Sequence, residues 1–353
     1  MTKVLAFVLA GGNGTRLHPL TNEHAKPALP FALGYRIVDF VLSNLVNSQI
    51  SPIYVLAQYK PRSLIEHIST TWMSRSAGME CGISVMLPRP DAVQGIFKGT
   101  AHAVYRNLDI IDRHQPDVVA VFAADHVYRM DVRQMVSFHC ERNADVTIGA
   151  VPVPIDKASS FGIMLTGSDG RIHEFQEKPE RPKPMPIHPG CSFASMGNYL
   201  FSRRVLVELL DEANRRGDTD FGRDILPRLP GSHRALAYDF SLNNVPGIRP
   251  HEERGYWRDI GTLDAYRDAQ RDVLGPLPRF SLVNPKWPVR GDYWARMSNV
   301  RSAAMGWQGA RPLGAGTGVS ALPSEKQRRP ESLVATRPGD PTPRLNPFVS
   351  AQH

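Results

Sequence analysis

An apolar run that leads into a glycine-rich loop near the N-terminus is the feature that most constrains the fold. Residues Val4–Leu9 are apolar and favour a buried strand, and Gly11, Gly12 and Gly14 follow closely. Because glycine has no side chain, the backbone N–H groups of this loop can lie directly against a large anion. Arg16 adds a forked cation suited to phosphate oxygens. The stretch therefore predicts a nucleotide phosphate site at the end of the first strand.

The loop does not fit the two commonest phosphate-binding patterns. The Walker pattern requires a Gly-Lys-Ser/Thr ending, and no lysine stands at that position. The dinucleotide-binding pattern would require a glycine where Leu17 stands. Taken alone, the loop could also be an ordinary tight turn between a strand and a helix.

The first half of the chain alternates strand-like and helix-like segments. This order predicts an α/β fold with a Rossmann-like, mostly parallel sheet and helices on both faces. Ligands in such sheets bind at the carboxyl ends of the strands, where loop 11–16 and Asp125 both fall. The expected strands are Val4–Leu9, Ile53–Ala57, Ser84–Leu87, Val118–Ala123 and Val146–Val153, and the expected helical segments are Ile37–Leu45, Ala101–Ile111, Arg203–Asn214 and Leu263–Val273.

The net charge of +8 comes almost entirely from the C-terminal part of the chain. Residues 276–353 hold 11 Lys and Arg against 4 Asp and Glu, a net of +7, which leaves +1 for residues 1–275. The large domain is thus nearly neutral, which argues against a nucleic-acid partner. We expect residues 276–305 to be a linker. Residues 306–353, rich in Gly, Pro, Arg and Ser, are expected to be a disordered tail.

Neither a secretory signal nor a membrane segment is evident in the sequence. No apolar run approaches the length of about 18 residues that a spanning helix requires. Cys81, Cys140 and Cys191 are odd in number and widely separated, which favours reduced thiols over disulfides or a zinc site. We therefore expect a cytoplasmic protein with no membrane partner.

A series of short motifs runs in a fixed order along the first 290 residues or so. The motifs are Gly11–Leu17, Ala25–Ala28, Tyr35–Phe40, Leu42–Asn44, Asn47–Ser48, Gln58–Lys60, Gly99–Ala101, Asn107–Ile111, Ala124–Tyr128, Phe161–Met164, Glu177–Pro179, Ala194–Gly197, Asp220–Gly222 and Tyr256–Leu263. The series resembles the sugar-nucleotidyltransferase family, whose members join a sugar 1-phosphate to a nucleoside triphosphate and release pyrophosphate. It looks most like the branch that transfers the adenylyl group of ATP to α-D-glucose 1-phosphate, giving ADP-glucose for glycogen or α-glucan synthesis.

The resemblance implies a fold of the nucleotide-diphospho-sugar transferase type, with residues 1–275 as its catalytic domain. Family members usually carry a C-terminal β-helix built from short repeats, and we find no such repeat in this sequence. Because that domain normally supports assembly, whether the chain forms a homo-oligomer stays open. The expected partners are ATP and α-D-glucose 1-phosphate.

The chemistry of such a transfer requires two polyanions to meet, so the site needs cations and a metal more than a protein nucleophile. The resemblance implies Arg16, Lys26 and Asp125 as catalytic residues, with Asp125 and Asp259 as ligands of Mg²⁺, which prefers oxygen donors. Thr262 is a better N-cap than Asp259 for the following helix, which leaves Asp259 for other work.

The remaining site residues are also implied by the resemblance. For the nucleotide they are Gly11, Gly12, Gly14, Thr15, Gln58, Gly99 and Thr100. For the sugar phosphate they are Phe97, Gly162, Glu177, Lys178, Ser195, Tyr199, Asp220 and Trp257. Phe97 stands where the family usually has a tyrosine, so one hydroxyl is missing here.

Two other functions stay open at this point. The chain could use UTP, dTTP, CTP or GTP with another hexose 1-phosphate. It could instead be a catalytically weak partner or regulatory subunit, although Arg16, Lys26, Asp125, Lys178 and Asp259 are all retained.

Overall fold

The computed structural model describes residues 2–72, 82–89 and 96–291, which all fall within one compact unit, Met1–Trp307. The predicted tail 306–353, residues 292–305 of the predicted linker, and Cys81 lie outside the described residues. The strands are β1 (Val4–Ala10), β2 (Pro30–Phe31), β3 (Tyr35–Arg36), β4 (Ile53–Ala57), β5 (Ile83–Met86), β6 (Val118–Ala123), β7 (His126–Tyr128), β8 (Val146–Pro154), β9 (Gly162–Thr166), β10 (Ile172–Glu177), β11 (Cys191–Ser202), β12 (Ala235–Asp239) and β13 (Trp257–Asp259). The α-helices are α1 (Val38–Asn47), α2 (Arg62–His67), α3 (Thr100–Tyr105), α4 (Leu108–His114), α5 (Val132–Glu141), α6 (Arg203–Arg216) and α7 (Leu263–Asp272).

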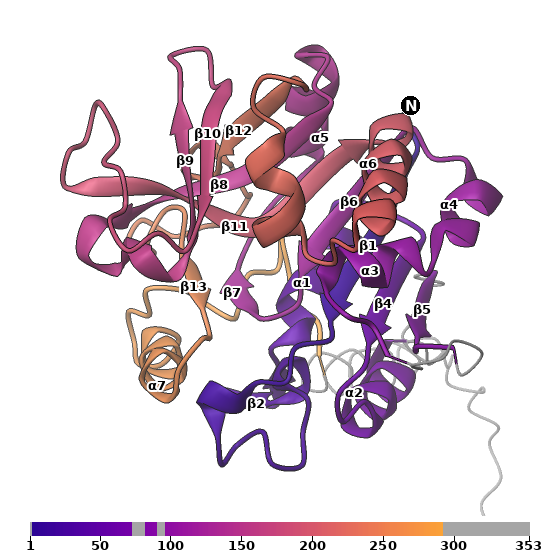
Figure 1. The fold of residues 1–353 in the computed structure, drawn as a ribbon. Helices are drawn as coiled ribbons and strands as arrows, with labels where there is room; N and C mark the ends of the chain where they lie inside the picture. The colour runs from indigo at the N-terminus through magenta and orange to yellow at the C-terminus, as the bar shows by residue number, and fades with distance from the viewer. Residues whose placement is uncertain (1, 73–81, 90–95, 292–353) are drawn as a thin grey trace, which may run out of the picture. The chain divides into compact units, whose positions relative to one another are not determined.

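One nine-stranded sheet organises the fold (Figure 1). Its strands follow the order β10-β9-β11-β6-β1-β4-β5, and β8 pairs with β11 and with β12. Strands β6, β1, β4 and β5 run parallel to one another, whereas β11 runs antiparallel to β6, β8 and β9. The expected mostly parallel sheet is confirmed for the first half of the chain, and antiparallel strands extend it in the second half.

The side chains of β1 alternate between two cores, which explains why helices cover both faces of the sheet. Ala6 and Val8 pack in a cluster with residues of α1, α2 and α5, while Leu5 and Phe7 pack with residues of α3, α4 and α6. A strand buried on both faces reads as a continuous apolar run, and this is the pattern of Val4–Ala10.

The helical segment expected over Ala101–Ile111 is divided in the structure into α3 and α4. The division lies at Asn107, whose side-chain amide donates to the carbonyl oxygen of Ala103 at 2.8 Å. This local bond competes with helix continuation. Both helices contribute to the same apolar core, so the apolar spacing runs unbroken across the division and conceals it.

Residues 276–291 pack onto the domain. Phe280 is buried between Phe40 and Tyr256, and its ring contacts both. The backbone N–H of Arg290 donates to Ser43 Oγ at 2.8 Å. This part of the segment predicted as a linker therefore contributes to the core.

The cysteines and the helices of the described residues bear on the compartment expected from the sequence. Cys140 and Cys191 are free thiols. Within residues 2–72, 82–89 and 96–291, none of the helices combines the length and apolar character needed to cross a membrane.

His139 in α5 is expected to make the fold sensitive to acid. Its Nδ1 lies 2.8 Å from Thr147 Oγ1, and burial lowers the pKa of His139 to about 4, against about 6.5 when unfolded. Between those values the unfolded chain binds a proton that the folded chain does not, so stability falls as the pH falls. From pH 7 to pH 5 this linkage is expected to cost about 2 kcal/mol of unfolding free energy.

Urea unfolding of the His139→Gln variant at both pH values tests this expectation. The variant should lose about 2 kcal/mol less than the wild type between pH 7 and pH 5. His188→Gln, at an exposed histidine, serves as the control and should keep the wild-type pH dependence. If the unfolding free energies of His139→Gln and the wild type changed equally between pH 7 and pH 5, the linkage would be contradicted.

Candidate active site

A cavity of about 430 Å³ opens where β1, β4 and β6 end. This is the edge of a parallel sheet at which ligands bind, because loops from several strands converge there. The cavity is lined by Leu9, Gly11, Gly12, Asn13, Leu56, Gln58, Tyr59, Phe97, Lys98, Gly99, Thr100, Ala103, Ala123, Asp125, Glu177, Lys178, Gly197, Tyr199, Asp220, Phe221 and Gly222.

Many residues that the sequence predicts for the site meet on this wall. They are Gly11, Gly12, Gln58, Phe97, Gly99, Thr100, Asp125, Glu177, Lys178, Tyr199 and Asp220. The other predicted residues lie off the wall, and they are Gly14, Thr15, Arg16, Lys26, Gly162, Ser195, Trp257 and Asp259. Lys26 and Asp259 nevertheless contact the wall through the group described next.

Two short strands bring the two predicted metal ligands together although 134 residues separate them. β7 and β13 form an antiparallel ladder in which His126 is opposite Asp259. The backbone N–H of Ile260 donates to the carbonyl oxygen of Asp125 at 3.2 Å and extends this connection. Thr262 caps α7 by accepting from the N–H of Ala265 at 3.2 Å, so Asp259 is not the cap. Both carboxylates can therefore serve one site.

Lys26 joins the two carboxylates. Its Nζ lies 2.7 Å from Asp125 Oδ2 and 3.5 Å from Asp259 Oδ1, and the residue is buried. Burial alone would lower the pKa of Lys26, but the charges of Asp125 and Asp259 outweigh it and raise that pKa. Burial opposes ionisation of Asp125 as well, yet Lys26 and then His126 hold its pKa well below the usual range. At neutral pH Lys26 is therefore an ammonium and Asp125 a carboxylate.

The glycine loop packs against the segment that carries Lys26. Gly14 has a left-handed φ of 65°, and a Cβ there would lie 3.0 Å from Thr21 Cγ2 and 3.4 Å from Lys26 Cβ. Thr21 Oγ1 donates to the carbonyl oxygen of Gly14 at 2.8 Å. Arg16 lies in the one-turn helix Thr15–Leu17 and is exposed. The loop thus positions Lys26 at the carboxylates, while Arg16 stays on the surface.

The part of the cavity predicted to bind the sugar phosphate contains Glu177 and Lys178. The two side chains pair, with Lys178 Nζ 2.8 Å from Glu177 Oε1. A Cβ at Gly222 would come 2.8 Å from Glu177 Oε2, and a Cβ at Gly162 would come 3.0 Å from the same oxygen. Glycines at these two positions therefore leave the space that the carboxylate of Glu177 occupies.

A close backbone contact fixes the wall between α3 and Asp220. A Cβ at Gly99 would lie 2.4 Å from the carbonyl oxygen of Thr219, so a larger residue does not fit. Thr100 Oγ1 donates to Asp220 Oδ2 at 2.9 Å and accepts from the N–H of Phe221 at 2.9 Å. The predicted nucleotide residue Thr100 and the predicted sugar residue Asp220 are thereby held together.

Two further predicted residues have local structural partners. Gln58 accepts a hydrogen bond from the backbone N–H of Phe97. Ser195 Oγ accepts from the N–H of Gly197 at 3.2 Å, where β11 bulges between Ser195 and Tyr199. Burial raises the pKa of Tyr199, so its hydroxyl stays protonated on the cavity wall.

Sequence reasoning missed several residues of this site. One of them is His126, which forms a group with the predicted residues Asp125 and Asp259. The potential ligand atoms of these three residues all lie within 4.8 Å of one another. Lys98 and Tyr59 also line the cavity. The sequence signal for His126, Lys98 and Tyr59 was adjacency, because each is the immediate neighbour of a predicted site residue.

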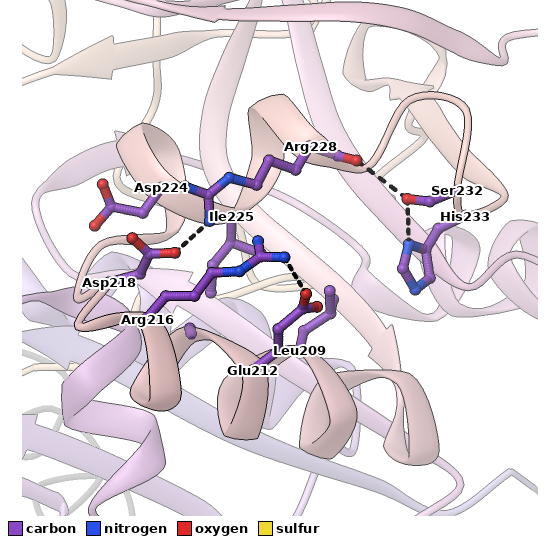
Figure 2. Close-up of a pocket in the computed structure, with 10 residues that line it drawn as sticks. Leu209, Glu212, Arg216, Asp218, Asp224, Ile225, Arg228, Ser232 and His233 are labelled. Atoms are coloured by element: carbon purple, nitrogen blue, oxygen red, sulfur yellow. Dashed lines mark hydrogen bonds and ion pairs between the residues drawn. The ribbon is translucent and has the colours of Figure 1, made fainter.

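A second cavity of about 300 Å³ lies between α6 and the turns that follow it (Figure 2). Figure 2 shows two arginines reaching across it, and both are neutralised locally. Arg216 pairs with Glu212, and Arg228 pairs with Asp218. None of the predicted site residues lines this cavity, so the first cavity is the candidate active site.

The chain is similar to proteins of known family and name. The family described as nucleotidyl transferase matches residues 5–275. The chain is 52% identical over 290 residues to the glucose-1-phosphate adenylyltransferase of Thermodesulfovibrio yellowstonii, with 82% of this chain and 71% of that relative covered. It is 48% identical over 297 residues to the enzyme of that name from Thermus thermophilus, with the same two shares covered. It is 46% identical over 292 residues to the one from Mycobacterium tuberculosis, covering 82% of this chain and 72% of the relative.

Proposed function

The chain belongs to the nucleotidyl transferase family, and we propose that it transfers the adenylyl group of ATP to α-D-glucose 1-phosphate, giving ADP-glucose and pyrophosphate. The relatives that bear the name glucose-1-phosphate adenylyltransferase support the choice of substrates. The product would supply α-glucan synthesis.

The observation that carries the proposal is the charge arrangement at the cavity. Asp125, which pairs with Lys26, lines the same cavity as the glycine loop and the Glu177–Lys178 pair, and Lys26 also pairs with Asp259. Such a site offers a backbone cradle for a triphosphate, a second cation for a sugar phosphate and a pair of carboxylates that can bind a cation.

A divalent cation fits the donor set of this group. Asp125 and Asp259 present carboxylate oxygens within 4.8 Å of each other, and carboxylates are the ligands that Mg²⁺ prefers. We infer that Asp125 and Asp259 hold Mg²⁺. When bound, the ion would neutralise charge on the phosphates of the nucleotide.

The reaction itself needs positioning more than a protein nucleophile. A phosphate oxygen of glucose 1-phosphate forms a bond to the α-phosphorus, and the bond to the bridging oxygen breaks, so that its electron pair leaves with pyrophosphate. Lys178 would hold the sugar phosphate, and Glu177 would accept hydrogen bonds from sugar hydroxyls. Lys26 would move from the carboxylates towards the phosphates as they enter, and Arg16 would close on the triphosphate from the surface.

The hydrogen bonding of Gln58 favours adenine over guanine. Its carbonyl oxygen accepts from the N–H of Phe97, and we infer that the amide NH₂ of this cavity-lining residue is the donor available to the base. A donor suits the ring nitrogen N1 of adenine, an acceptor, and opposes the N1–H of guanine. The expected selectivity for ATP over GTP follows from this arrangement.

A triphosphate panel tests the proposed function. The full chain is incubated with Mg²⁺, glucose 1-phosphate and ATP, UTP, dTTP, CTP or GTP in turn, and pyrophosphate release is measured. We expect the highest kcat/KM with ATP. A clear preference for another triphosphate would refute the adenylyl assignment, and no turnover by folded protein with any of them would favour a partner or regulatory subunit.

Gly222→Ala is expected to weaken sugar binding. The added methyl would lie 2.8 Å from Glu177 Oε2, so this carboxylate must move away from the sugar hydroxyls that it is proposed to bind. Loss of one hydrogen bond of about 1.4 kcal/mol raises the KM for glucose 1-phosphate about tenfold. The KM for ATP should change much less, and initial-rate kinetics with each substrate varied separately measure both constants.

Gly190→Ala provides the matched control, because a Cβ there meets nothing within 4 Å and Gly190 lies outside the cavity. It should keep both KM values. An unchanged KM for glucose 1-phosphate in Gly222→Ala would argue against the role of Glu177.

A further inference from the structure

His126 is a buried residue at the cation-binding group that the proposed mechanism leaves without a role. Its Nε2 lies 3.4 Å from Asp125 Oδ1 and 3.7 Å from Asp259 Oδ1. The imidazole is therefore close to both carboxylates that are proposed to hold the divalent cation. Only 9% of its side chain is exposed.

The surroundings of His126 hold its ring in one orientation. Its ring packs against Trp257 with the ring centroids 5.0 Å apart. On another side, a Cβ at Gly197 would lie 3.3 Å from His126 Cε1, so the ring contacts the β11 bulge closely. The ladder between β7 and β13 fixes the backbone of His126 opposite Asp259. The ring is thus packed on two sides while Nε2 is directed at the carboxylates.

The other ring nitrogen supports the same orientation. Among the described residues, His126 Nδ1 is buried and has no hydrogen-bond partner. A half-turn of the ring would exchange Nε2 with Cε1, which a Cβ at Gly197 would meet at 3.3 Å, and would take Nε2 out of its present position beside the carboxylates. The contacts to Asp125 and Asp259 are the polar contacts that the site provides for this side chain.

The spacing of the three donor atoms fits a shared cation. Two ligands at right angles and about 2.1 Å from an ion are about 3.0 Å apart. The separations of 3.4 and 3.7 Å from Nε2 to the two carboxylate oxygens exceed this value by less than 1 Å. Lys26 Nζ already occupies a cationic position between the carboxylates, which shows that the group accommodates a positive charge there.

We propose that His126 Nε2 is the third protein donor to this cation, and that it gives the site a higher affinity for Mn²⁺ than for Mg²⁺. Mg²⁺ retains its waters and takes oxygen ligands, whereas first-row transition ions accept imidazole nitrogen readily. The inference rests on the proposed function, because it concerns the cation that Asp125 and Asp259 are proposed to bind. If His126 had only a structural role, replacing it would lower the affinities for Mn²⁺ and Mg²⁺ equally.

Metal binding by the full chain without substrates tests the proposal. Free Mn²⁺ is followed by its EPR signal during titration, and Mg²⁺ affinity is obtained by competition. The wild type should bind Mn²⁺ at least about tenfold more tightly than Mg²⁺. His126→Gln should lose about tenfold in Mn²⁺ affinity and less than about threefold in Mg²⁺ affinity. Equal losses for the two ions, or no loss, would overturn the proposal.

Pulsed EPR of Mn²⁺ bound to the wild type gives a direct second measurement that does not depend on how the variant folds. A coordinated imidazole nitrogen produces a ¹⁴N modulation, which should change when the protein is made with ¹⁵N-histidine. Absence of a histidine nitrogen coupling would refute His126 as a ligand. His233→Gln, at the second cavity in Figure 2, is the matched control and should retain wild-type Mn²⁺ binding.

The design separates this inference from the proposed function. Bound Mn²⁺ with a histidine coupling but no turnover with any triphosphate would leave His126 as a ligand and refute the enzyme reaction. Turnover with ATP together with a metal site that lacks histidine nitrogen would support the enzyme reaction and refute His126 as a ligand.

Discussion

Replacing Asp125 by Asn is expected to lower kcat for ADP-glucose formation by about a thousandfold or more while the protein stays folded. The substitution keeps the size of the side chain and removes the negative charge that lies 2.7 Å from Lys26 Nζ. It also removes one of the two carboxylates proposed to hold Mg²⁺. The charge that develops on the phosphates during transfer is therefore stabilised less well. Pyrophosphate release at saturating ATP and glucose 1-phosphate measures the effect.

The fold should tolerate this change because Lys26 keeps a second carboxylate. Asp259 Oδ1 lies 3.5 Å from Lys26 Nζ and still neutralises it, so the ammonium is not left buried and unpaired. Asp268→Asn is the control, since its exposed carboxylate pairs with Arg271 on the surface of α7. The metal and charge role of Asp125 would be refuted if Asp125→Asn, shown to be folded by thermal unfolding, kept more than about a tenth of the wild-type kcat.

The core strands could be predicted closely because burial on both faces leaves a distinct pattern. β4 and β6 begin and end at the predicted residues, and β1 extends one residue further, to Ala10. These strands are short continuous apolar runs bounded by polar or turn residues, and both of their faces are covered. The division at Asn107 could not be predicted, because a hydrogen bond from that side chain leaves the apolar spacing unchanged.

The group of Asp125, His126 and Asp259 shows how far the site could be predicted from the sequence. Asp125 could be identified from its place just after a buried strand, but its contact with Asp259 depends on the pairing of β7 with β13. Each of these strands has only three residues, too few to show a pattern. For His126 the sequence offers adjacency to Asp125 alone, because β7 is too short to show which way its side chains point.

The glycine loop illustrates the difference between identifying a motif and placing its side chains. The sequence favoured Arg16 as a main cation of the site, yet Arg16 is exposed and Lys26 is the cation buried at the carboxylates. Leu17 provides the physical reason, since it is buried in the core and anchors the turn Thr15–Leu17 inwards. Its neighbour Arg16 consequently faces solvent, and the charge of Lys26 reaches the site from a later segment.

Lys26→Gln is expected to lower kcat by about a hundredfold and to change the response of the protein to Mg²⁺. Without the ammonium, Asp125 and Asp259 face each other with less neutralising charge, so the metal-free protein should be less stable. A divalent cation would replace the missing charge, and ligand binding to the folded state raises stability. The rise in Tm on adding Mg²⁺ should therefore be larger for Lys26→Gln than for the wild type.

Pyrophosphate release and thermal unfolding with and without Mg²⁺ measure the two effects separately. Lys183→Gln is the matched control, because Lys183 pairs with Glu174 at an exposed site and should affect neither kcat nor the Mg²⁺ response. A wild-type kcat in Lys26→Gln would exclude a role in the reaction. A lowered kcat with a wild-type rise in Tm would show that Lys26 acts on the phosphates alone. We expect both a low kcat and a larger rise in Tm on adding Mg²⁺. This pair of results follows if the Lys26 ammonium neutralises the carboxylates before the substrates bind and the phosphates afterwards.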